Sequence, residues 1–239
     1  MSDSAAITFD HLFSSYGTEE VLRDLQGSVA VGEIFLVVGP NSSGKSALAR
    51  LCMGLETPRK GAVRMHSREI GYIPQGPGLI SNRSAMENVL LPLRYLQDYV
   101  GGGEMEAIVN DLFDKFDIAP FRGKLPGELS AGIQKRIAIV RALASKPVIL
   151  VVDNLTQEVD ILEGIRTLQV LKRVSKEMKL TVLLFSGHLE PEIRIADRMA
   201  ILFEGRFQAT GTPTDVRKSG HPWLREIAAA EQALGSASP

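Results

Sequence analysis

Residues 39–46 constrain the fold of this chain more than any other part of its sequence. They read Gly-Pro-Asn-Ser-Ser-Gly-Lys-Ser and fit the pattern G-x-x-x-x-G-K-[ST], a loop that wraps nucleotide phosphates. The apolar run Ile34–Val38 before the loop is typical of a buried strand, and the residues from Ala47 onward are typical of a helix. A strand, a glycine-bounded loop and a helix N-terminus together make an anion site. The alternative is an ordinary strand–helix turn with a chance lysine, and residues elsewhere in the chain argue against it.

The loop predicts a specific division of labour among its side chains. Lys45 can reach the β- and γ-phosphates, and the Ser46 hydroxyl can bind Mg²⁺. A nucleotide enzyme also needs an acidic residue at a sheet edge to hold Mg²⁺ through its water shell, and Asp153 ends the apolar run 148–152. An ordinary strand-terminal Asp is the alternative. The residues of this segment predicted to bind nucleotide are Gly39, Pro40, Asn41, Ser42, Ser43, Gly44, Lys45, Ser46 and Ala47.

The composition is that of an ordinary globular protein. A formal net charge of -1 gives no overall field that attracts nucleic acid, so no nucleic-acid partner is expected. The single cysteine, Cys52, cannot form an internal disulfide, which favours a reducing compartment. The first residues lack the regions of a secretion signal, and no apolar run approaches the roughly 20 residues of a membrane span. These features predict a cytoplasmic protein whose membrane role would depend on a partner.

The order of the predicted elements indicates one α/β domain over residues 1–239, with an inserted helical region. Alternation of strands and helices around the phosphate loop stops near residue 84 and returns near residue 146. The core is therefore assigned to residues 5–83 and 146–212, the helical insert to residues 84–145, and a C-terminal helical tail to residues 213–239. Strands are predicted at residues 7–13, 27–31, 34–38, 62–65, 70–73, 148–152, 180–185, 199–203 and 206–210.

Local signals mark several helix boundaries. Ser84 begins a capping-box pattern, and the helix that follows is expected to kink or restart at Pro92. Residues 101–103, three glycines, are expected to form a flexible break. A short helix is expected after Thr212, and the tail beyond Ala230 is expected to fray. The other helices are predicted at residues 104–116, 130–144 and 161–178.

The start of the helix at residue 130 carries a family resemblance. Leu129-Ser130-Ala131-Gly132-Ile133 resembles the LSGGQ signature of ATP-binding-cassette (ABC) ATPases, and the likeness extends over residues 7 to 228. It implies a P-loop NTPase fold of the ABC type, with a RecA-like core, an N-terminal antiparallel β region, an α-helical subdomain insert, and ATP and Mg²⁺ as cofactors. It also implies a homo- or heterodimer with a second ABC ATPase subunit. There Ser130 and Gly132 would face the γ-phosphate across the dimer. A plain helix cap is the alternative for Ser130.

The resemblance assigns roles to four further residues. Tyr16 is expected to stack on adenine. Gln75 is expected to contact Mg²⁺ or water and to sense the membrane partner, and His188 to contact the γ-phosphate. Asp160 is expected at the contact between the two subunits. The alternative for Tyr16 is a surface or core tyrosine, and the alternative for Gln75 is an ordinary loop residue. The metal ligands are then Ser46, Gln75 and Asp153.

The sequence departs from the ABC pattern where hydrolysis would occur. The family follows the Asp153 position with a glutamate that polarises the attacking water, and this chain has Asn154. An amide cannot accept the proton, and losing a general base costs about 10²–10⁴ in rate, or about 3–5 kcal/mol of barrier. Glu158 and Asp160 could in principle substitute. Further departures are Ser42, Ala131, Ile133, Leu155, Gln157, Glu158 and Val159. They favour natural divergence over an engineered change at Asn154, and they predict ATP binding with weak or absent hydrolysis.

Within the family, several segments resemble the ATPase subunit of bacterial phospholipid-trafficking (Mla-type) transporters. The resemblance implies a separate transmembrane permease, contacted by residues 75–81 and the helical insert, and a location at the inner face of the cell membrane. A soluble ABC protein outside a transporter and a non-catalytic regulatory or heterodimer subunit are the alternatives. The cargo, the direction of transport and the composition of the dimer stay open. The segments concerned are residues 87–93, 126–130, 195–198, 211–213 and 221–227.

Overall fold

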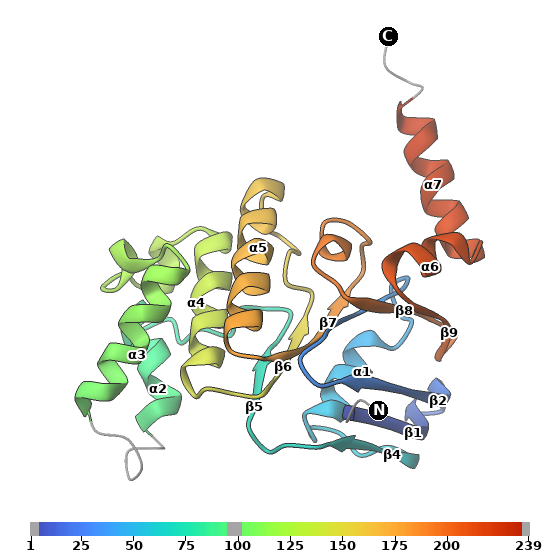
Figure 1. Cartoon of the computed structure of the whole chain (residues 1–239), viewed down its shortest axis with the longest axis horizontal. Coiled ribbons are helices and arrows are strands. Elements are labelled where there is room, and N and C mark those ends of the chain that lie inside the picture. Colours follow the sequence, from blue (N-terminus) through green and yellow to red (C-terminus); the bar gives the residue numbers. More distant parts are fainter. Residues whose placement is uncertain (1–4, 95–101, 236–239) are drawn as a thin grey trace.

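A computed structural model describes residues 5–94 and 102–235 of the chain, which fold into two β-sheets and a group of helices (Figure 1). The larger sheet has six strands in the order β5-β6-β7-β3-β8-β9. All neighbouring pairs in it are parallel except β8 and β9, which form an antiparallel hairpin. The strands are β3 (Ile34–Val38), β5 (Ile70–Ile73), β6 (Ile149–Asp153), β7 (Thr181–Ser186), β8 (Arg198–Phe203) and β9 (Arg206–Gly211).

The register of the parallel strands brings three strand ends to one edge of this sheet. Val38 of β3 pairs with Ser186 of β7, and Asp153 of β6 pairs with Phe185 of β7. The loops after β3, β6 and β7 therefore begin side by side, at the carboxyl edge where parallel sheets bind ligands. The strands predicted in this region are confirmed, with ends that shift by one residue at most.

The smaller sheet is antiparallel, in the order β2-β1-β4, and all three of its strands are longer than the sequence predicted, β4 by two residues. The expected strand at residues 7–13 is part of β1 (Ala5–Tyr16), and that at 27–31 overlaps β2 (Glu19–Ala30). β4 (Lys60–Met65) pairs with the other side of β1. The polar, exposed residues of β2 hid its length, because pairing with β1 rather than apolar content holds that part of the strand.

Helix α1 (Lys45–Cys52) is buried between the two sheets. Its Leu48, Leu51 and Cys52 share one apolar cluster with Phe9 of β1 and Phe35 of β3. The helix begins at Lys45, two residues before the sequence suggested, so the lysine and Ser46 lie in its first turn. Packing on both sides therefore fixes the helix N-terminus that faces the loop.

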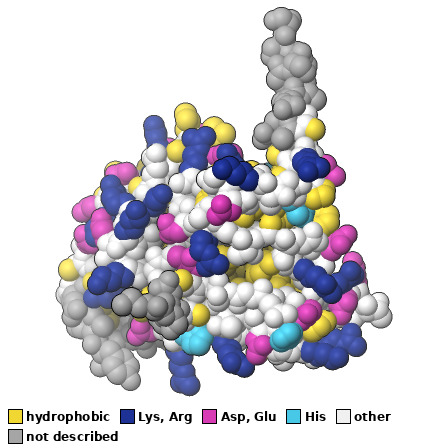
Figure 2. Space-filling model, turned by 45° about the vertical axis from the view of Figure 1, so that its right-hand side comes forward, with side chains coloured by type: hydrophobic (Ala, Val, Ile, Leu, Met, Phe, Trp, Pro, Cys, Tyr) yellow, Lys and Arg dark blue, Asp and Glu magenta, His cyan; other side chains and the backbone are white. Residues whose placement is uncertain are grey.

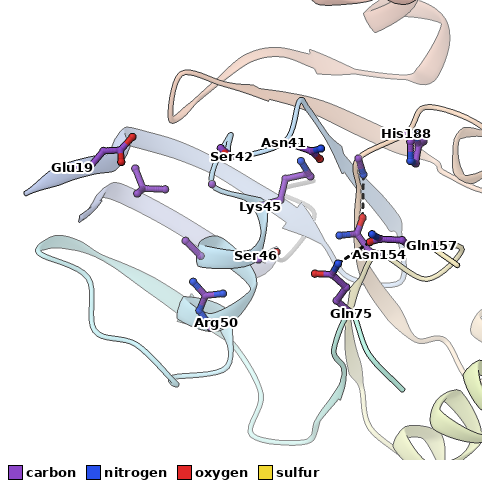
Figure 3. A pocket seen from close by; sticks show the side chains of 14 residues that line it. Glu19, Asn41, Ser42, Lys45, Ser46, Arg50, Gln75, Asn154, Gln157 and His188 are labelled. Atoms are coloured by element: carbon purple, nitrogen blue, oxygen red, sulfur yellow. Dashed lines mark hydrogen bonds between the residues drawn. The ribbon is translucent and has the colours of Figure 1, made fainter. Parts of the chain in front are cut away.

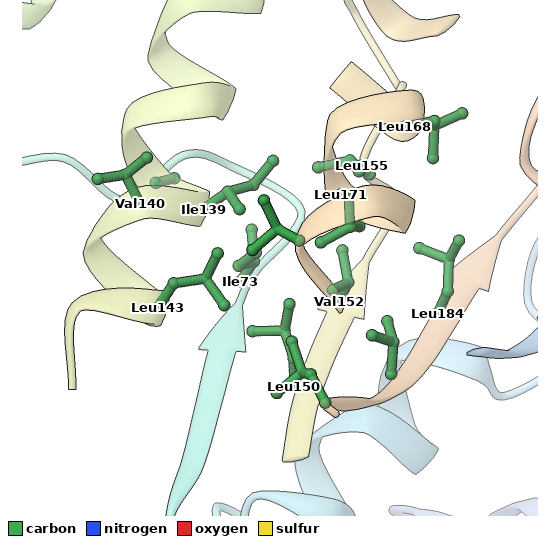
Figure 4. Packing of buried hydrophobic residues seen from close by; sticks show 14 of the residues in the cluster. Ile73, Ile139, Val140, Leu143, Leu150, Val152, Leu155, Leu168, Leu171 and Leu184 are labelled. Atoms are coloured by element: carbon green, nitrogen blue, oxygen red, sulfur yellow. The ribbon is translucent and has the colours of Figure 1, made fainter. Parts of the chain in front are cut away.

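The opposite face of the larger sheet packs against the other helices. α4 (Ala131–Ala144) and α5 (Ile161–Glu177) lie beside β5 and β6, and Ile139, Leu150 and Leu171 meet there (Figure 4). α2 (Ala85–Arg94) and α3 (Gly102–Lys115) pack on α4. In the sequence, all three helices lie between β5 and β6. A second apolar cluster thus joins this helical group to the core.

Two helix expectations need correction. α2 does not restart at Pro92: the helix runs through the proline to Arg94, the last residue described there. α3 is described from Gly102 onward, so Gly102 and Gly103 are helical rather than a break. Gly101 lies outside the described residues.

The C-terminal part begins as predicted and then extends further. The Thr212 and Asp215 side chains each bond the other's backbone N–H at 3.2 Å and cap α6 (Pro213–Lys218). α7 (Pro222–Gly235) continues past Ala230, where fraying was expected, and projects from the body of the molecule (Figure 1). The last four residues lie outside the described part. No helix within residues 5–94 and 102–235 is long and apolar enough to cross a membrane. Acidic and basic side chains are interspersed over the face shown in Figure 2.

Candidate functional site

The loop between β3 and α1 takes its shape from two glycines that no other residue could replace without strain. A Cβ on Gly39 would lie 2.1 Å from the carbonyl oxygen of Leu202. Gly44 has φ 104°, and a Cβ there would lie 2.8 Å from Leu22. Ser42 also has a left-handed backbone, with φ 64°, at a position where the ABC pattern has glycine. The two glycines therefore let the backbone turn tightly ahead of the helix N-terminus.

Lys45 bonds the backbone of the loop that precedes it. Its ammonium donates to the carbonyl oxygens of Gly39 and Pro40, at 2.8 Å each, and the side chain is only 6% exposed. Burial lowers the pKa of Lys45 to about 8, although the Asp153 carboxylate opposes that shift. A phosphate oxygen is a stronger acceptor than a neutral carbonyl, so the lysine is placed to exchange these partners for an anion.

A cavity of about 680 Å³ opens beside the loop (Figure 3). This is within the range of about 300–1,000 Å³ typical of small-molecule sites. Gly39, Pro40, Ser43 and Asp153 do not line it; the first three shape the loop from behind. The cavity is lined by Glu19, Val21, Asn41, Ser42, Gly44, Lys45, Ser46, Ala47, Arg50, Gln75, Asn154, Gln157, Gly187 and His188.

Asp153 and Ser46 form an oxygen pair next to Lys45. Asp153 is 3% exposed, and burial raises its pKa, while a hydrogen bond from the Ser46 hydroxyl and the charge of Lys45 act in the opposite direction. Hydroxyl and carboxylate oxygens are ligands that suit Mg²⁺, which completes its shell with phosphate oxygens and water. This donor set fits the metal that the sequence predicts, with Asp153 behind the cavity wall.

At the far end of the cavity the side chains are amides and one imidazole. The Asn154 side-chain oxygen accepts from the backbone N–H of Gly187 at 3.1 Å, and its amide nitrogen donates to Asp153 at 3.4 Å. Because Gly187 N–H can only donate, the oxygen of Asn154 must face it. Asn154 is thus held between β6 and the loop that carries His188.

The side chain of Gln75, which follows β5, lines this end of the cavity and is bonded to a second lining side chain. Its side-chain nitrogen donates to the side-chain oxygen of Gln157 at 2.9 Å (Figure 3). Gln157 replaces a residue that is small in the ABC pattern. The longer side chain lets the segment after β6 reach the loop after β5.

The acidic residues that could have replaced a glutamate at position 154 lie elsewhere. Asp160 caps α5, where its carboxylate accepts from Leu162 N–H at 2.9 Å, and Glu158 is exposed. Neither lines the cavity. Glu19, from β2, is the one acidic residue among the described lining residues, and it lies across the cavity from Asn154 (Figure 3).

Ser130 and Gly132 lie apart from this cavity. Ser130 caps α4, and its hydroxyl accepts from the Ile133 N–H at 3.4 Å, as the alternative of a plain helix cap predicts. Gly132 packs against Glu163 of α5, where a Cβ would lie 3.3 Å from the glutamate Cβ. Arg136, one turn later, forms a 2.7 Å ion pair with Glu163 and anchors the segment. A role of Ser130 and Gly132 toward nucleotide therefore requires a second subunit and stays a prediction.

The sequence reasoning missed six residues of this region, and one of its predictions falls outside the described residues. Three of the six are the lining residues Glu19, Val21 and Gly187. Gln157 and Arg50 line the cavity, and buried Lys135 contacts its wall from α4. The unusual size of Gln157 was the only available signal. The side chain of Tyr16 lies outside the described part, so adenine stacking stays a prediction.

Comparison with known proteins identifies the family of this arrangement. Residues 22–157 match the model of the protein family described as "ABC transporter". The methionine import ATP-binding protein MetN of Cupriavidus necator is 34% identical over 215 residues, which cover 84% of this chain and 62% of that protein. MetN of Caulobacter vibrioides is 31% identical over 227 residues, covering 88% and 68%. The chain thus spans about two thirds of the length of these relatives.

Solved structures agree on the fold. The ATP-binding cassette MJ0796, in a dimeric post-hydrolysis state with ADP and Pi, has a TM-score of 0.78 at 26% identity and covers 87% of this chain and 98% of its own. CbiO1 of Clostridium perfringens has a TM-score of 0.82 at 22% identity, covers 97% and 98%, and is compared for fold alone. The predicted fold class, an ABC-type P-loop NTPase, is confirmed. The chain belongs to the ABC transporter family.

Proposed function

We propose that this chain is the ATP-binding subunit of an ABC importer for an amino acid of the methionine type, and that it holds ATP far better than it hydrolyses it. Asn154 carries the second half of this proposal. It stands where the family's proton acceptor is expected, and its amide is engaged by Gly187 and Asp153. The other polar side chains at that end are two further amides, Gln75 and Gln157, and the imidazole of His188.

Support for ATP binding comes from the loop and its surroundings. The ammonium of Lys45, the N-terminus of α1 and the loop amides provide positive potential where the triphosphate would lie. Ser46 and Asp153 would hold Mg²⁺, which neutralises phosphate charge. Gln75 is expected to reach this metal or its water after leaving Gln157, and Tyr16 to stack on the base.

Slow hydrolysis follows from the chemistry at Asn154. A neutral amide can orient a water molecule but cannot take its proton at neutral pH. The deficit of about 10²–10⁴ would place turnover below about 10⁻² per second, if an intact cassette turns over about once per second. Such a subunit could still drive transport in a dimer with an intact cassette, because one of the two ATP sites shared between the subunits could then hydrolyse ATP.

The partners follow from the family. A second ABC subunit would complete the site with Ser130 and Gly132, with Asp160 at the contact. A transmembrane permease would dock on residues 75–81 and the helical group, and this docking would bring the chain to the inner face of the cell membrane. ATP-driven closing of the dimer would then move the permease.

The cargo assignment differs from the sequence expectation. Phospholipid transport gains no support from the relatives compared above, because both are named for methionine import. Amino-acid import is therefore the better-supported proposal.

Two measurements test this function. Purified chain should bind Mg-ATP, and its phosphate release should be at background, equal to that of a Lys45→Ala variant. Release at an ordinary transporter rate that Lys45→Ala abolishes would contradict the impaired hydrolysis. For the cargo, the permease that co-purifies with the chain is reconstituted in vesicles. Uptake of labelled methionine supports the assignment, whereas transfer of a labelled phospholipid alone would restore the lipid alternative.

A further inference from the structure

Lys135 is a buried ammonium that none of the predicted roles uses. It lies on α4, five residues after Ser130, and its side chain is 4% exposed. The ammonium donates to the backbone carbonyl oxygen of Gln75 and, at 3.3 Å, to that of Asn154. One side chain of the signature helix therefore ties together two loops that end at the nucleotide cavity.

The charge of Lys135 has no close compensation among the described residues. No carboxylate of residues 5–94 and 102–235 lies within 4.0 Å of its nitrogen, and burial holds the pKa of Lys135 below its ordinary value, while Glu158 and Asp153 act in the opposite direction. Backbone carbonyls are thus its main partners. If the Lys135 ammonium moved away from those carbonyls, it would be a buried charge without hydrogen bonds, which costs free energy. The contacts should therefore persist when the loops move.

The neighbouring residue shows what Lys135 adds. Arg136 points to the other side of α4, where it pairs with Glu163 and donates to Thr167 of α5 at 3.2 Å. Successive residues on a helix are separated by about 100°. Arg136 therefore holds α4 on α5, whereas Lys135 holds α4 on the loops after β5 and β6.

We propose that Lys135 is a positioning residue that couples the chain's own nucleotide cavity to the signature segment that it presents to a second subunit. When nucleotide binding moves Gln75 or Asn154, their backbone carbonyls displace the ammonium of Lys135 that is bonded to them. Because a helix moves as a rigid unit, α4 then shifts Ser130 at its N-terminus. The bond between Gln75 and Gln157 brings the segment after β6 into the same unit. This inference rests on the proposed ATP-driven dimer.

The experiment separates binding within one subunit from assembly between two. Lys135→Met keeps most of the side-chain volume and removes the charge, Lys135→Arg keeps a cation, and Lys176→Met, at an exposed position on α5, is the matched control. Mg-ATP affinity is measured at protein concentrations that keep the chain monomeric. Dimerisation at saturating Mg-ATP is measured by sedimentation.

Lys135→Met should change monomer affinity for Mg-ATP by less than about threefold but weaken ATP-dependent dimerisation by about tenfold, within the usual range of allosteric coupling. Lys135→Arg should recover most of the loss, and Lys176→Met should behave as the natural chain. Equal dimerisation of Lys135→Met and the natural chain would overturn the coupling. A fall in thermal stability and monomer affinity with no selective loss of dimerisation would also overturn it, as a purely structural role.

If Lys135→Met does not fold, hydrogen exchange of the natural chain tests the coupling instead. Mg-ATP added to the monomer should change the exchange of amides in the first two turns of α4, although these residues do not line the cavity. No change there, with clear protection of the phosphate loop, would overturn the coupling. Failure of the natural chain to bind Mg-ATP or to dimerise would instead contradict the proposed function.

Discussion

The two ends of the nucleotide cavity differ in how completely they are built. At the phosphate-loop end, Lys45, Ser46 and the N-terminus of α1 converge, with Asp153 directly behind. At the other end, Asn154, Gln157 and Gln75 offer amides where the family places a proton acceptor. Under the proposed function, nucleotide binding would rely on loop shape and distributed positive potential, whereas cleavage would depend on a single basic group. The comparison teaches that one substitution can uncouple cleavage from binding, because the two use different parts of one site.

The largest expected effect tests the phosphate-loop end. Lys45→Ala removes the buried ammonium, and charge-assisted contacts of this kind are worth about 1.5–3 kcal/mol, so the affinity for Mg-ATP should fall by about 100-fold. Equilibrium binding of a fluorescent ATP analogue measures it, with exposed Lys218→Ala as the control. Unchanged affinity would show that the loop is not the phosphate site.

The next effect tests the amide end. Asn154→Glu supplies a carboxylate beside Asp153, and like charges so close raise the pKa of one of them, which suits a proton acceptor. Phosphate release should rise at least about tenfold over the natural chain. Asn154→Gln is the matched control, because it has the length of glutamate without its charge. If Asn154→Glu stays inactive, the other departures in the site already disable hydrolysis.

A smaller effect concerns the proton on Lys45. With a pKa of about 8, Lys45 loses its proton as pH rises through 8, whereas a bound phosphate would retain it. Binding must then take up a proton above pH 8, so ATP affinity should fall with rising pH, by at most about tenfold per unit. Calorimetry in buffers of different ionisation heat should show uptake near zero at about pH 6.5 and near one proton at about pH 9. Proton release on binding would contradict this charge assignment.

The smallest expected effect concerns Ser42. Its left-handed backbone, at φ 64°, costs about 1–2 kcal/mol relative to glycine, partly offset by the greater unfolded-state entropy of glycine. Ser42→Gly should therefore stabilise the fold by at most about 1 kcal/mol, and raise Tm by about 2–4 °C. Ser42→Ala, measured alongside by thermal denaturation, should give no such gain. A lower Tm for Ser42→Gly would mean that the serine side chain itself supports the loop.

Sequence patterns predicted the larger sheet well and the smaller one in part. The apolar strands β3, β6 and β7 are buried on both faces, so composition alone marks them. The N-terminal half of β2 is mostly exposed, so its residues carried no comparable signal and its length emerged only from pairing with β1. Pro92 and Gly102 misled because local propensity was weighed without the packing of α2 and α3 on α4.

The sequence by itself determined the phosphate loop, the position of Asp153 at a strand end, and the replacement of a glutamate by Asn154, because each is a feature of a short segment. Only the tertiary structure decided what these residues touch. Gln75 meets Gln157, Lys135 meets the carbonyls of Gln75 and Asn154, and Asp160 is used as a helix cap. The physical reason is that such partners are far apart in the chain or depend on side-chain direction. Strand order and helix packing bring them together, and no local pattern records those contacts.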